Sequence, residues 1–264
     1  MDSTLALFIA LVSYGNRYIK HDLSAPDLDF NNSTLIYCNE LEFTTNIFLK
    51  EVVAKSPGEW FRFLKKNGSK ELRISYRHSD QLQVKDYEMA GFVGGGGEWI
   101  IEVAYGNYTD YWVCQLDVVN PDANDHRIWN IQFAKIKDLA SIPSSDVSIE
   151  NAKADLSISL SNIIAFSSKH SPQGWTKIFE QALRNLSSQK PEWLYYKDCF
   201  VIEPYSLPRK QLFTSAATAY VFGGMGSWND IWYDTPELEK QNSELSADLY
   251  DKVVQAVVAA VNIN

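Results

Sequence analysis

Hydrophobic residues in the second half of the chain recur at helical spacing. From Ile149 to Ile163 and from Trp175 to Leu186, apolar side chains appear every three or four positions, which places them on one face of a helix. A third stripe runs from Leu245 to Val261 after a capping box at Asp234–Glu237, although the polar residues Gln241–Ser243 are able to break that helix. We therefore expect a mainly helical second half.

The first half alternates apolar and polar residues with the period of two that is typical of β-strands. Four segments show this alternation, at residues 72–76, 99–103, 112–118 and 129–133. Turn-like segments join them, so we expect the strands to pair in sequence order as an antiparallel meander. A helix that begins near Ser3 and a second helix that begins at Ser56–Pro57 are expected to flank the sheet.

These patterns predict an α+β fold, with an antiparallel β-meander and flanking helices in the first half and a mainly helical second half. Residues 1–140 would hold the sheet with the N-terminal helices, and residues 141–264 the helical region. The serine-rich segment around Pro143 marks the boundary. Two separate domains and one compact domain are both compatible with this length.

Composition and charge narrow the class of protein. The chain of 264 residues is 45% hydrophobic and 13% aromatic, which excludes a disordered protein and predicts a substantial core. Its formal charge of −9 argues against nucleic acid or an anionic membrane as a partner. Cys38, Cys114 and Cys199 are widely separated, and the apolar run Leu5–Val12 lacks the features of a secretion signal. We therefore expect a cytoplasmic protein with buried, reduced thiols.

The segment Ala216–Asp234 combines an apolar helix end with a turn rich in glycine and tryptophan. Gly223 stands where a helix stop is expected, and Gly226 where a neighbouring backbone could come close. Trp228 and Trp232 concentrate large apolar surface around them. Two interpretations follow: the cluster packs in the core beneath a structured loop, or it forms an exposed aromatic contact surface.

Few residues suggest catalysis. Glu98 and Glu102 should project from one face of a strand, and His126 lies in a later turn. The glycine run at residues 94–97 lacks the lysine and the following helix of a phosphate-binding loop. His78 with Asp80, and Asp122 and Asp125 with His126, do not have the spacing of a defined metal site. The sequence therefore predicts no cofactor and no metal.

Two functional hypotheses remain. The first is a soluble acidic protein-interaction module, such as a bacterial immunity-type protein that binds and neutralises a basic toxin. Its contact residues would be Trp228, Asn229, Asp230 and Trp232. The alternative is a hydrolase that uses Glu98, Glu102 and His126. The pattern favours the non-enzymatic hypothesis and leaves the partner's identity and the oligomeric state open.

Overall fold

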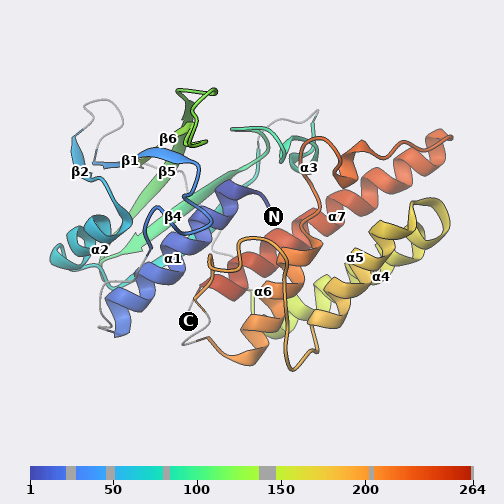
Figure 1. Ribbon diagram of the computed structural model, residues 1–264. Helices are drawn as coiled ribbons and strands as arrows, with labels where there is room; N and C mark the ends of the chain where they lie inside the picture. The colour runs from blue at the N-terminus through green and yellow to red at the C-terminus, as the bar shows by residue number, and fades with distance from the viewer. Residues whose placement is uncertain (22–27, 46–50, 80–83, 137–146, 202–204, 263–264) are drawn as a thin grey trace.

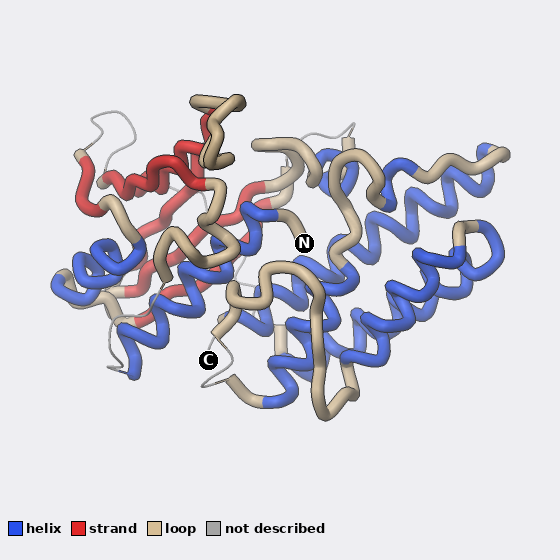
Figure 2. The backbone as a smooth tube through the Cα atoms, in the orientation of Figure 1, coloured by secondary structure: helices blue, strands red, loops and turns tan. Residues whose placement is uncertain are grey.

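The computed structural model describes residues 1–21, 28–45, 51–79, 84–136, 147–201 and 205–262. Its strands gather on one side of the molecule and most of its helices on the other, as Figure 1 and Figure 2 show. The first half contains the sheet and the second half is mainly helical. The α+β prediction is therefore confirmed.

One six-stranded sheet forms the first half, in the order β2-β1-β6-β5-β4-β3. Its strands are β1 (Cys38–Thr44), β2 (Val52–Ala54), β3 (Glu71–Arg77), β4 (Glu98–Ala104), β5 (Thr109–Val118) and β6 (Trp129–Ile136).

The sheet is mixed, so the prediction of an antiparallel meander was wrong for the sheet as a whole. Strands β3, β4, β5 and β6 pair antiparallel with one another in sequence order, but β1 runs parallel to β6, with Leu41 opposite Ile131. Alternation of polar and apolar residues reports that a segment is a strand and carries no information about its partner. The pairing of β1 joins segments that are far apart in the sequence.

Two helices cover the apolar face of this sheet, α1 (Ser3–His21) and α2 (Pro57–Lys66), as Figure 1 shows. Helix α2 begins where predicted, because the Ser56 hydroxyl accepts a hydrogen bond from the Glu59 amide and Pro57 occupies the first turn. It brings Trp60 onto Phe43, with ring centroids 4.6 Å apart. No described helix combines the length and the apolar character that a bilayer span requires.

The remaining helices are mostly in the second half. Their bounds are α3 (Asp86–Met89), α4 (Ile149–His170), α5 (Gln173–Asn185), α6 (Leu207–Ala219), the 3-10 turn η1 (Trp228–Asp230) and α7 (Pro236–Val261). Helices α4, α5, α6 and α7 pack on one another. Helix α7 continues through Gln241–Ser243, and Asn242 faces the interior.

Two asparagine side chains join the edge strand β3 to the helices. Asn16 of α1 receives a hydrogen bond from the Leu72 amide at 2.8 Å and donates one to the Leu72 carbonyl at 2.7 Å. Asn262, at the end of α7, makes the same pair of bonds with Ile74, at 2.8 and 2.9 Å. Each side chain thus replaces a neighbouring strand and satisfies backbone groups that the sheet edge would leave unpaired.

A group of buried tyrosines forms a second joint between the sheet and α7. The Tyr76 hydroxyl lies 3.1 Å from the Tyr250 hydroxyl, donates to Asp86 at 3.0 Å and accepts from the Gly97 amide at 2.9 Å. Burial raises the pKa of Tyr250 to about 12, and it raises the pKa values of Tyr76 and Tyr220 above their ordinary range. The folded protein therefore keeps these phenols protonated at a pH near 10, where a free tyrosine begins to lose its proton.

We expect Asn16→Ala to lower the free energy of unfolding by about 2–4 kcal/mol, because the Leu72 amide and carbonyl would both lose a buried partner. Urea unfolding followed by circular dichroism would measure the change. The control is Asn31→Ala, whose exposed side chain bonds only within its own loop and should cost less than about 0.5 kcal/mol. Equal stabilities of the two variants would contradict this role for Asn16.

We also expect alkaline destabilisation. Tyrosines in the unfolded chain lose their protons near pH 10, whereas the buried phenols keep theirs, so above that pH the unfolded state binds fewer protons. The free energy of unfolding should then fall between about pH 10 and 12, by up to about 1.4 kcal/mol per pH unit for each tyrosine. Urea titrations over this range would measure the slope. Tyr250→Phe should make it shallower, and an unchanged slope would contradict the assignment.

Candidate functional site

The predicted contact residue Trp228 lies in the protein core. Its side chain is 0% exposed, and its indole nitrogen donates a 2.7 Å hydrogen bond to the Ser246 hydroxyl of α7. Its ring packs edge-on against Phe179, with centroids 5.1 Å apart, and against Trp175. Trp228 therefore packs in the core, as the first of the two interpretations predicts. It fixes the loop before α7 to the helical half.

The other predicted contact residues are more accessible. Asn229 is half-buried and donates to the Tyr87 carbonyl at 2.9 Å. Asp230 is exposed, and its carboxylate accepts a hydrogen bond from the Gly226 amide. The Trp232 side chain is 88% exposed. Asp230 and Trp232 are thus the two of the four whose side chains are open to a partner.

Gly91, which follows α3, permits a close approach between its backbone and that of this loop. Helix α6 ends at Ala219 with Tyr220 as its cap, so Gly223 does not stop the helix as predicted. A Cβ atom on Gly91 would lie 2.1 Å from the carbonyl carbon of Gly223. The close approach of the two backbones therefore depends on Gly91. Gly226 instead adopts a positive φ of 81°, which glycine allows.

The hydrolase candidates do not share a cavity. Glu98 forms an ion pair with Arg77, and Glu102 lies opposite Arg73 in the strand register, both on the polar face of the sheet. Glu98 also lines a cavity of about 660 Å³ beside the glycine run, but neither Glu102 nor His126 is among its lining residues. His126 is exposed in the loop between β5 and β6. A concerted acid–base mechanism needs these groups within reach of one substrate atom.

The cavity beside the glycine run is poorly suited to phosphate. Among the residues that the structure describes, its lining contains the carboxylates of Asp2, Glu98 and Asp117 and no lysine, arginine or histidine. Backbone amides of a glycine loop bind phosphate well only where the surrounding field is not negative.

His78 lies between two carboxylates, although its predicted neighbour Asp80 lies outside the described residues. Its Nδ1 atom is 3.1 Å from Asp86, and its Nε2 atom is 3.7 Å from Asp251 of α7. Both ring nitrogens therefore face protein carboxylates, an arrangement that links the end of β3 to α7. Within the described ranges, no three histidine, cysteine, aspartate or glutamate side chains are grouped as a metal ion would require.

The three cysteines are free thiols. Burial raises the pKa of Cys38 to about 12 and raises that of Cys199 as well. A thiol with such a pKa is almost entirely protonated at neutral pH and is a weak nucleophile. The cysteines therefore offer no catalytic centre of the thiolate type.

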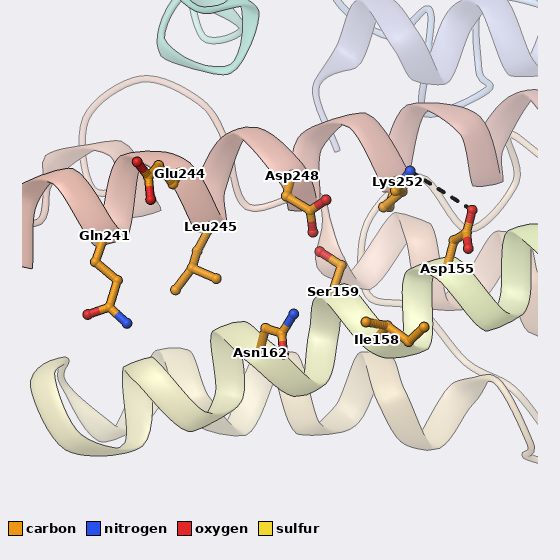
Figure 3. Close-up of a pocket in the computed structure, with 9 residues that line it drawn as sticks. All are labelled: Asp155, Ile158, Ser159, Asn162, Gln241, Glu244, Leu245, Asp248 and Lys252. Carbon is orange, nitrogen blue, oxygen red and sulfur yellow. Dashed lines mark ion pairs between the residues drawn. The ribbon is translucent and has the colours of Figure 1, made fainter.

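A groove between α4 and α7 gathers acidic and polar side chains that the sequence analysis did not select. Its volume is about 400 Å³, and Figure 3 shows the two helices that form its walls. Lys252 lies at one end, 3.9 Å from Asp155. The carboxylates are Asp155, Glu244 and Asp248, the polar neutral groups are Ser159, Asn162 and Gln241, and the apolar residues are Ile158 and Leu245.

The charges of this groove are only partly compensated. Glu244 is paired with Lys240 at 3.9 Å on an exposed surface, where such a pair has little energetic effect. Asp248 has no ion pair within the described part of the chain, and it also lines the neighbouring cavity that contains His78. An unpaired carboxylate beside weakly paired ones on a rigid helix attracts cationic groups.

One sequence signal could have identified the groove. Ser159 occupies an apolar-face position of its helix, seven residues after Ala152 and four before Ile163. A polar residue in such a stripe indicates either a buried hydrogen bond or a functional opening in the core. The facing residues on α7 were not predictable, because nothing in the local sequence specifies which helix packs there.

We expect Trp228→Ala to destabilise the protein by about 3–5 kcal/mol, because it leaves a cavity in the core and removes the partner of Ser246. Trp232→Ala, at an exposed position, should change the free energy of unfolding by less than about 0.5 kcal/mol. Chemical denaturation of both variants would measure the difference. A Trp228→Ala protein as stable as the parent would refute the core assignment.

Three comparisons with known proteins, against family models, curated proteins and solved structures, found no match to this chain. Its function is therefore inferred from the chemistry of its own surface. The acidic α4/α7 groove and the exposed Trp232 are the features on which that inference depends.

Proposed function

We propose that this protein is a cytoplasmic, acidic protein-interaction module that binds and neutralises a basic toxin, in the manner of a bacterial immunity protein. The observation that carries the proposal is the row of carboxylates on α7. Glu244, Asp248 and Asp251 follow one another at helical spacing, and the first two line the α4/α7 groove. This row presents negative charge from a long, well-anchored helix.

The charge of the whole molecule supports a basic protein as the partner. A net charge of −9 accelerates diffusional encounter with a positively charged surface and slows encounter with another acidic one. The same charge repels a nucleic-acid backbone and an anionic membrane, so neither is proposed as the main partner. Rapid association is useful for a protein that must capture a toxin before it reaches its target.

Two exposed apolar residues, one in the groove and one just before α7, are candidates to anchor the complex. The Ile158 side chain lines the groove and is 62% exposed, and Trp232 is 88% exposed just before α7. The neighbouring Tyr233 is tied to Ser171, at the junction of α4 and α5, by a 2.7 Å hydrogen bond. Tryptophan is among the residues that contribute most to binding energy in protein interfaces. The arrangement supplies charge for steering and apolar surface for retention.

The test is to capture a partner with the tagged protein at low salt, purify both proteins and measure association by surface plasmon resonance. We expect a basic partner whose association slows as salt increases. The double variant Glu244→Gln with Asp248→Asn should associate about tenfold more slowly. Co-expression of the protein with its partner should also restore growth to cells that the partner alone inhibits.

The matched control removes two negative charges elsewhere. Asp122→Asn with Glu192→Gln alters exposed residues that have no side-chain hydrogen bond or ion pair within the described ranges, and it should leave the association rate within about twofold. If both double variants slow association equally, net charge rather than the α7 surface governs binding. An acidic partner, or a basic one that does not inhibit growth, would contradict the proposal.

A further inference from the structure

The Ser159 hydroxyl in the wall of the α4/α7 groove has no hydrogen-bond partner. The residue is 2% exposed, and its Oγ atom is buried and makes no hydrogen bond within the described part of the chain. In Figure 3 this hydroxyl points from α4 into the space between the helices, toward Asp248 on α7. Most buried polar groups in folded proteins are satisfied, so an unsatisfied one that faces a groove calls for an explanation.

Three other serines on the same helix behave differently. Ser161 donates to the Ser157 carbonyl at 2.7 Å, and Ser167 and Ser168 donate to carbonyls of the preceding turn. This is the usual way for a helical serine to satisfy its hydroxyl. Ser159 makes no such bond in this structure, so its hydroxyl remains without a partner.

The groups around Ser159 are suited to an organic cation with an apolar stem. The Asp248 carboxylate faces the same space in Figure 3 and offers hydrogen-bond acceptors, and Asn162 lies beside it. Ile158 and Leu245 provide apolar contact along the groove. An alkyl chain that ends in an ammonium group would match both parts, since its methylenes bury apolar surface and its head remains with the carboxylates.

We propose that the α4/α7 groove binds a lysine side chain of the basic partner, whose ammonium group donates hydrogen bonds to Ser159 and Asp248. This assignment rests on the proposed function, because it names how the partner would dock. The ammonium group suits the site better than a guanidinium group. Its three donors can reach the hydroxyl and the carboxylate in different directions, whereas arginine is best matched by a carboxylate that accepts both arms of its fork.

The decisive variant is Ser159→Ala, because it removes a hydrogen-bond acceptor without changing the charge that draws in any polycation. Binding of a short oligolysine peptide to the full chain would be measured by isothermal titration calorimetry at physiological salt. We expect Ser159→Ala to weaken binding about fivefold to tenfold and Asp248→Asn to weaken it by about tenfold or more. Ser161→Ala is the matched control and should bind within about twofold of the parent.

Two further peptides test the chemistry of the ligand. Oligolysine acetylated on every side chain should bind at least about tenfold more weakly, because it lacks the ammonium group. Oligoarginine of the same length should lose little when Ser159 becomes alanine. Equal sensitivity of both cationic peptides to Ser159→Ala would overturn the assignment to lysine.

Thermal stability supplies an independent readout. Removing a buried hydroxyl that has no partner should leave the melting temperature of Ser159→Ala unchanged or higher. A lower melting temperature would mean that the hydroxyl is satisfied within the fold, and would overturn the inference. Oligolysine binding that is insensitive to Ser159→Ala would also overturn it.

The outcomes for the natural partner separate the two proposals. If a basic toxin binds and is neutralised but Ser159→Ala has no effect on its affinity, the interaction function stands and the lysine site fails. If oligolysine binds through Ser159 but no basic partner is found, the lysine site stands and the proposed function fails.

Discussion

The free edge of β3 is the constraint on which the arrangement of the molecule depends. An edge strand leaves backbone amides and carbonyls without a strand to pair them, and such an edge invites pairing with other chains. Here the Asn16 and Asn262 side chains bond to Leu72 and Ile74 and so cover that edge from α1 and from the end of α7. These amides occupy the place of a missing strand, and Asn262 joins the helical half to the sheet.

Because α7 is fixed in this way, the direction in which each of its other faces points is also fixed. Leu249, Val253 and Val257 are buried in the core, so the helix cannot rotate without exposing them. The carboxylates of Glu244 and Asp248 are consequently held toward α4, where they line the groove. A binding surface on a rigid helix loses less conformational entropy on association than one on a mobile loop. The same contacts that stabilise the fold therefore pre-organise the acidic surface.

Local patterns predicted what depends on neighbouring residues in the sequence. The cap at Ser56 and the continuous apolar stripe of α7 are of this kind, as is the alternation that identifies β3 to β6. The parallel pairing of β1 with β6 and the bond from Asn16 to Leu72 connect distant segments, and single-sequence patterns do not encode such partners. The groove belongs to this second group, because α4 and α7 supply it jointly. The sequence therefore predicted the acidic character of the protein but not where its carboxylates converge.

Polar residues on the buried faces of helices show which elements of this chain pack together. Asn16 and Ser246 both lie on buried helix faces, and each has a clear structural partner, in β3 and Trp228 respectively. Their hydrogen bonds offset the cost of burying them, and they specify which elements meet. Ser159 has the same setting without a partner, and it alone of the three faces a groove lined by carboxylates. An unsatisfied hydroxyl makes the fold less stable than alanine would, and the proposed lysine contact would supply the partner that the fold itself does not.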